Sequence, residues 1–122
     1  MANPVIHFEI PADDLERLKK FYADLFGWGM KTSPNMPGYV MVETVTDGMG
    51  ISGGIMKKKM PTQPPVNYVA VASVIDYANK LTQLGGQVVV PRTPIPGMGY
   101  FAVGLDPEGN PIGLFEMDSG AA

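Results

Sequence analysis

Residues 5–28, VIHFEIPADDLERLKKFYADLFGW, carry the pattern that decides the fold. The segment 5–10 predicts a strand, and the segment 13–26 predicts an amphipathic helix. The apolar side chains of this helix recur at three- and four-residue spacing, at Leu15, Leu18, Phe21, Tyr22 and Leu25. Asp13 is predicted as its N-cap, and Gly27 provides a left-handed stop. The stretch is therefore a strand followed directly by a helix.

The second half of the chain repeats this plan. Residues 73–84 predict a second helix, with Ser73 as its N-cap. Three strands follow each helix, and Gly38-Tyr39 matches Gly99-Tyr100 when the halves are aligned. Residues 91–99, rich in proline and glycine, are predicted as a loop. The predicted strands are 5–10, 28–32, 39–45, 50–56, 66–72, 87–92, 100–105 and 112–117.

This internal repeat predicts an α+β fold built from two βαβββ modules. Each half is too small to bury both faces of its sheet, so the modules are expected to form a curved mixed sheet around a cavity. We expect one domain, 1–122, with module one at about 1–57, a linker at about 58–65 and module two at about 66–117. A cavity between paired modules is where a small ligand is expected.

Composition narrows the class of protein. The chain has 122 residues, a net charge of −3 and no cysteine. The acidic balance argues against nucleic acid as a partner, and the absence of cysteine excludes disulfides and thiolate chemistry. The lysine run 57–59 is predicted to be a solvated linker. No membrane span or signal peptide is recognisable, so we expect a cytoplasmic protein.

Two stretches resemble the vicinal oxygen chelate superfamily, which includes glyoxalases, bleomycin-resistance proteins and extradiol dioxygenases. They are residues 7–28, which end in FYADLFGW, and residues 66–116, which end in DPEGNPIGLFE. The resemblance implies paired βαβββ modules, a small-molecule ligand and a homodimer. In many members the cavity holds a divalent metal, which would be nickel, zinc, manganese or iron.

The resemblance also implies metal ligands. It places one on His7, in the first strand of module one, and one on Glu116, in the last strand of module two. Tyr68 stands where a second histidine is expected. The ligand set is therefore incomplete, because a catalytic metal commonly takes about three protein ligands.

Other residues are candidates for catalysis or ligand binding. Glu9 lies two residues after His7 and therefore on the same strand face, where it could act as a general base. Glu116 could move a proton in the same reaction. If Leu114 faces the helix, Glu116 does too, and it then needs a partner. Five side chains could line the cavity, and we predict that they contact the ligand. They are His7, Tyr39, Tyr68, Arg92 and Tyr100.

Two versions of the function stay open at this point. One is a metal-dependent lyase or isomerase of glyoxalase type, in which the metal polarises adjacent substrate oxygens. The other is a metal-free protein that binds or sequesters a ligand, as bleomycin-resistance proteins do. Dioxygenase chemistry is disfavoured because a single histidine cannot supply the two-histidine iron set. A third class is an interaction protein whose own side chains fill the cavity.

Overall fold

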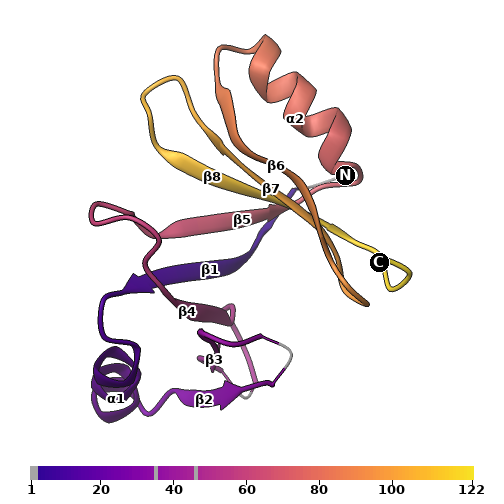
Figure 1. Cartoon of the computed structure of the whole chain (residues 1–122). Coiled ribbons are helices and arrows are strands. Elements are labelled where there is room, and N and C mark those ends of the chain that lie inside the picture. The colour runs from indigo at the N-terminus through magenta and orange to yellow at the C-terminus, as the bar shows by residue number, and fades with distance from the viewer. Residues whose placement is uncertain (1–2, 35, 46) are drawn as a thin grey trace. The chain divides into compact units, whose positions relative to one another are not determined.

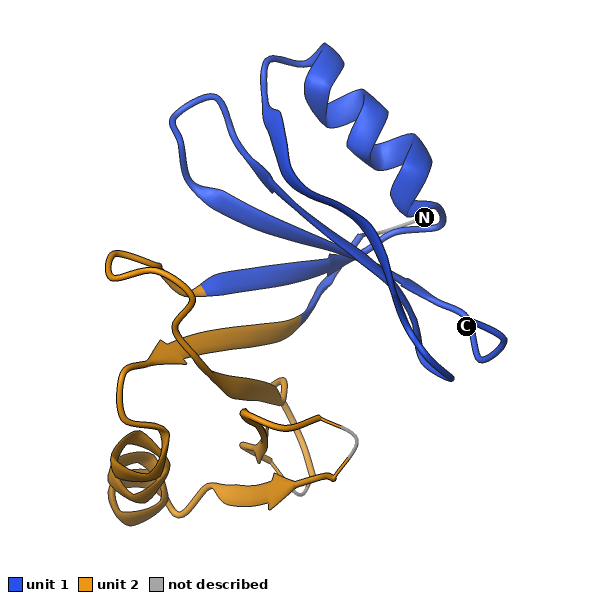
Figure 2. Ribbon diagram, in the orientation of Figure 1, with its two compact units in different colours: residues 1–6, 66–122 blue, residues 7–65 orange. Residues whose placement is uncertain are grey.

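The computed structural model describes residues 3–34, 36–45 and 47–122 (Figure 1). The chain divides into two compact units (Figure 2). Unit 1 comprises Met1–Ile6 and Val66–Ala122, and unit 2 comprises His7–Pro65. The two helices of the described residues are both too short to cross a lipid bilayer.

Unit 2 contains a strand, a helix and three further strands. They are β1 (Val5–Ala12), which begins in unit 1, then α1 (Leu15–Phe26), β2 (Gly29–Thr32), β3 (Tyr39–Glu43) and β4 (Gly53–Lys57). The strand order is β2-β3-β4-β1. β1 and β4 run parallel, and the other pairs are antiparallel.

Unit 1 repeats the same order of elements. They are β5 (Val66–Ala70), α2 (Val74–Gln83), β6 (Gln87–Ile95), β7 (Gly99–Leu105) and β8 (Pro111–Met117). The strand order is β5-β8-β7-β6, and again only one pair, the first and last strands of the module (β5 and β8), is parallel. The predicted α+β fold with two βαβββ modules is confirmed.

Alternation along the strands of unit 2 sends one set of side chains to the helix. Phe8 and Ile10 pack with α1 on a buried cluster around Ile55. The full buried set is Ala12, Val40, Val42 and Ile55. His7 and Glu9 therefore lie on the opposite side of the sheet. We call this side the distal face of unit 2, and it also carries Tyr39, Met41, Gly54 and Met56.

The core of unit 1 is built in the same way. Its buried residues are Val71, Val74, Ala102 and Leu114. Tyr77 and Ala78 of α2 pack against this cluster, and so does Tyr100 of β7. Tyr100 therefore faces α2, and its neighbour Phe101 faces the other side of the sheet.

The start of α1 differs from the prediction by one residue. Asp14, not Asp13, is the N-cap, and its Oδ1 accepts a hydrogen bond from the Arg17 amide at 3.1 Å. The reason is that β1 continues to Ala12, so the chain turns into the helix later than expected. Asp13 instead forms an ion pair with Lys58 at 3.3 Å.

Two other predicted helix signals are confirmed. Gly27 ends α1 with φ of 73°, and its amide donates to the carbonyl of Ala23. Ser73 caps α2, where its Oγ accepts from the Asp76 amide at 3.2 Å.

The alignment of the two halves is wrong by one residue in the third strand. Tyr39 pairs with Met56 in the sheet register, whereas the residue in the corresponding place of unit 1 is Phe101, paired with Phe115. Tyr100 lies opposite Glu116 and faces the helix. Matching the halves glycine to glycine misplaced this strand, because a one-residue shift moves every side chain to the other face.

The loop predicted to begin at residue 91 is also corrected, since β6 extends to Ile95 and contains Pro91 and Pro94. β6 pairs only with β7, and its register shifts twice. A proline is tolerated in an edge strand because its missing amide leaves no ladder bond unmade.

Candidate functional site

A hydrogen-bonded pair stands on the distal face of unit 2. Nε2 of His7, on β1, lies 2.7 Å from the hydroxyl oxygen of Tyr39, on β3. The two rings are nearly parallel, with an interplanar angle of 10° and centroids 6.5 Å apart. Both side chains are half-buried. Which atom donates depends on the imidazole tautomer.

Gly54 makes this pairing possible. β4 lies between β3 and β1 in the sheet, so the tyrosine must reach across it. A Cβ atom at residue 54 would overlap the ring and the hydroxyl of Tyr39. The absence of a side chain there gives the ring its place on the sheet. The sequence signal was present as Gly53-Gly54, but only the register shows which of the two faces Tyr39.

The environment keeps the His7 imidazole neutral. Burial lowers its pKa below the usual value of 6.5, and the nearby charge of Glu9 opposes that shift without cancelling it. A neutral imidazole has one donor and one acceptor nitrogen. The pair therefore offers a ligand neutral, adaptable hydrogen-bonding groups on a surface that also carries Met41 and Met56.

A groove of about 520 Å³ adjoins this pair. It is lined by the approach to β3 and by the end of β4, and we call it the lysine groove. Its lining residues are Met36, Pro37, Gly38, Tyr39, Met56, Lys57, Lys58 and Lys59. Tyr39 belongs both to the groove and to the pair with His7, so the two features are continuous.

Glu116, where the resemblance implied a metal ligand, lies beside the start of α2. It lies on the face of β8 that carries Leu114, toward α2, as the alternation argument anticipated. Its Oε1 accepts a hydrogen bond from the amide of Val74, the first residue of α2, at 3.0 Å. A carboxylate there satisfies an otherwise unpaired helix amide and complements the helix dipole.

The other candidate residues fall into two groups within unit 1. Tyr68 is only 7% exposed, and its ring lies over Gly113 and meets Phe101 edge to face. Arg92 and Tyr100 contact each other, with the guanidinium carbon 3.6 Å from the ring centroid. This contact is a cation–π interaction on the α2 side of the sheet. Their roles as ligand contacts stay predictions.

The residues do not fit a divalent metal. Within the described ranges 3–34, 36–45 and 47–122, no three histidine, aspartate or glutamate side chains gather into a possible metal site. Nε2 of His7 already bonds to Tyr39, and the carboxylate of Glu116 bonds to a helix amide. A metal at His7 would have to displace the tyrosine and find further ligands.

Replacing Gly54 with alanine tests the packing of the pair. The new methyl group should push Tyr39 aside and break its bond to His7, as Tyr39→Phe does directly. Both variants should shift the NMR signals of the single imidazole in the same direction, and Tyr39→Phe should cost about 1 kcal/mol of unfolding free energy.

The matched control is Gly29→Ala, since its methyl group would meet Glu43 Cβ at an ordinary 3.6 Å. Imidazole signals that stay unchanged in a folded Gly54→Ala and in Tyr39→Phe would contradict the pairing.

Replacing Glu116 tests its role at the start of α2. Glu116→Ala should lower the free energy of unfolding by about 1 kcal/mol, because the Val74 amide loses its acceptor. Glu116→Gln retains an acceptor oxygen and should lose less. Denaturant unfolding of both variants gives the comparison, and an alanine variant as stable as the parent would show that the bond does not support the helix.

Comparison with known proteins agrees with the fold and the sequence pattern. The family model for the bleomycin resistance protein-like N-terminal region matches residues 5–45. The putative glyoxylase CFP32 of Mycobacterium tuberculosis is 30% identical over 116 residues, which cover 90% of this chain and 44% of the relative. The same match is found in Mycobacterium bovis. The chain thus spans less than half the length of these curated relatives.

Two solved structures share the fold at low identity. A glyoxalase/bleomycin resistance protein/dioxygenase superfamily member from Vibrio splendidus has a TM-score of 0.65 and 11% identity, over 94% of this chain and 99% of that one. The Mn(II)-bound glyoxalase from Novosphingobium aromaticivorans has a TM-score of 0.63 and 16% identity, over 98% of this chain and 40% of that one. The repeated βαβββ order, the family match and these relatives together support the assignment of the chain to the glyoxalase/bleomycin resistance protein/dioxygenase superfamily.

Proposed function

We propose that this protein binds a small organic molecule on the distal face of unit 2, against the His7–Tyr39 pair, without a metal ion. The observation that carries the proposal is the 2.7 Å hydrogen bond between two half-buried side chains. Small-molecule sites commonly combine an apolar surface with a few fixed polar groups. Here Met41 and Met56 supply apolar surface, and the imidazole and phenol supply the polar groups.

The chemistry of the pair favours binding over metal-assisted catalysis. The lowered pKa of His7 keeps the imidazole uncharged, so it can bond to a ligand hydroxyl, amide or carbonyl with little desolvation cost. The lyase or isomerase version needs a Lewis acid, and the donors available in the described residues do not fit one. The match to a bleomycin resistance protein-like model supports the binding version.

Glu9 is the remaining functional candidate on this face. It shares the strand and the face with His7, and its charge acts on the imidazole. We propose that it helps to orient the imidazole or contacts the ligand itself. Its role as a general base, the homodimer and the cytoplasmic location stay predictions.

Ligand screening by NMR tests the proposal. Compounds from a fragment library that bind the full chain should shift the imidazole signals of His7 and the amide signals of β1, β3 and β4. His7→Ala should weaken such binding about tenfold, which corresponds to about 1.4 kcal/mol. Tyr39→Phe should have a smaller effect, because the imidazole remains.

Tyr77→Phe is the matched control, since Tyr77 is a half-buried tyrosine on α2 whose hydroxyl also takes part in a hydrogen bond, with the side chain of Asn3. It should leave affinity unchanged. Ligands that bind equally well to His7→Ala, or that shift only the signals of other surfaces, would contradict a site at the pair.

A further inference from the structure

The lysine run 57–59 spans the end of β4 and the start of the segment that connects β4 to β5. Lys57 and Lys59 are exposed, as expected of a solvated run, and Lys58 is half-buried. The run begins with Lys57, the last residue of β4, and it lines the lysine groove together with Met36 and Tyr39. The Lys57 amide donates to the carbonyl of Gly38 at 3.3 Å, which ties the two walls of the groove together. The run therefore places positive charge beside the proposed site.

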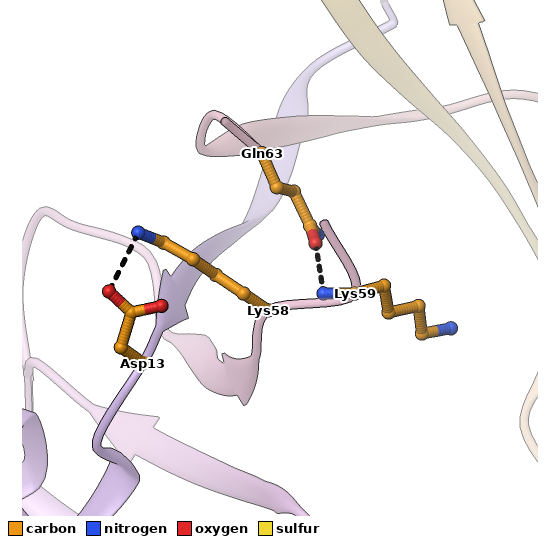
Figure 3. A network of polar contacts seen from close by, with 4 residues as sticks. All are labelled: Asp13, Lys58, Lys59 and Gln63. Carbon is orange, nitrogen blue, oxygen red and sulfur yellow. Dashed lines mark hydrogen bonds and ion pairs between the residues drawn. The ribbon is translucent and has the colours of Figure 1, made fainter. Parts of the chain in front are cut away.

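The chain beyond β4 is held in place by local hydrogen bonds. The amide of Lys59 donates to Oε1 of Gln63 at 2.7 Å (Figure 3). The Gln63 amide in turn donates to the carbonyl of Met60 at 3.2 Å. These bonds fold residues 59–63 back on themselves and fix the backbone from which Lys59 projects.

The positive charge of the groove is only partly balanced. Lys58 forms an ion pair with Asp13, and in Figure 3 it points away from Lys59. In the part of the chain that the structure describes, neither Lys57 nor Lys59 forms a salt bridge, and no acidic residue lines the groove. A cationic groove on a chain of net charge −3 is a local feature that would attract an anion.

The other side of the groove is apolar. Met36, Met56 and the ring of Tyr39 provide surface for a hydrocarbon or aromatic group, and methionine adapts readily to different shapes. The volume of about 520 Å³ suits a small molecule. Tyr39 also bonds to His7, so a ligand seated against the Tyr39 ring contacts one member of the hydrogen-bonded pair.

We infer that the lysine groove selects a small organic anion, with its carboxylate or phosphate near Lys57 and Lys59 and its apolar body on Met36, Met56 and Tyr39. This inference rests on the proposed function, because Tyr39 belongs to both sites. It adds the chemical class of the ligand, which the His7–Tyr39 pair alone does not define.

Four probes separate the contributions of charge and apolar surface. They are naphthoate, naphthyl phosphate, the uncharged naphthol and inorganic phosphate. The two organic anions should shift the amide signals of residues 57–59 and Tyr39 and the imidazole signals of His7. Naphthol should bind about tenfold more weakly, phosphate alone should bind weakly, and about 0.5 M salt should weaken the anions but not naphthol.

A paired variant locates the charge. Lys57→Gln combined with Lys59→Gln should weaken binding of naphthoate about tenfold and leave naphthol unchanged. The control is Lys19→Gln combined with Lys20→Gln, which removes the same charge from α1 and should change neither affinity. The relative affinities of naphthoate and naphthyl phosphate show which acidic group the groove prefers.

The outcomes distinguish this inference from the proposed function. Equal affinity for naphthoate and naphthol, or an unchanged naphthoate affinity in the Lys57/Lys59 double variant, would overturn the anion groove. The proposed function would survive that result if naphthol still shifted the imidazole of His7. If no probe shifted either the imidazole or the groove amides, both would be overturned.

Discussion

The strict alternation of side chains along β1 is the constraint on which the rest of unit 2 depends. Phe8, Ile10 and Ala12 enter the core under α1, which fixes the strand in one register. The same alternation leaves His7 and Glu9 on the distal face. A shift of one residue would bury a histidine and a glutamate under the helix, at a large desolvation cost. The core thus determines where the chemistry can lie.

Glycine and tyrosine form the same arrangement twice. Tyr39 lies over Gly54 in unit 2, and Tyr68 lies over Gly113 in unit 1. In both places a β-carbon would overlap the ring, so the glycine makes room for a tyrosine on the sheet. The two tyrosines come from different strands of their modules, since Tyr39 is on β3 and Tyr68 on β5. The two modules therefore have similar tyrosine–glycine packing, although the tyrosine comes from the third strand of one module and from the first strand of the other.

Much of the fold could be predicted from the sequence because helix spacing, strand patterns and the internal repeat are local signals. The N-cap at Asp14 was missed because either of two consecutive aspartates, Asp13 or Asp14, could serve as the N-cap. Only the length of β1 decides between them. The strand around Tyr100 was misplaced for a related reason. Register depends on pairing partners such as Glu116, which a single strand does not specify.

The candidate site was predictable in part. His7 was singled out as the only histidine, and its partner Tyr39 was among the predicted ligand contacts, but their pairing depends on a strand that lies between them. The role of Glu116 at α2 required knowing which helix amide lies nearby. The linker at 58–65 was predictable from its lysines and prolines, and these residues do connect β4 to β5. The groove was not predictable, because it forms only where the approach to β3 packs beside the lysine run.

The most direct test of this account is to add zinc, nickel, manganese or iron ions in equimolar amount to metal-free protein and follow the imidazole signals of His7. The account predicts that the signals stay where they are, because Nε2 remains bonded to Tyr39 and the described residues place no full ligand set around it. A stoichiometric change in these signals, together with bound metal that the Tyr39→Phe variant retains and the His7→Ala variant loses, would contradict it and would show that this imidazole coordinates a metal.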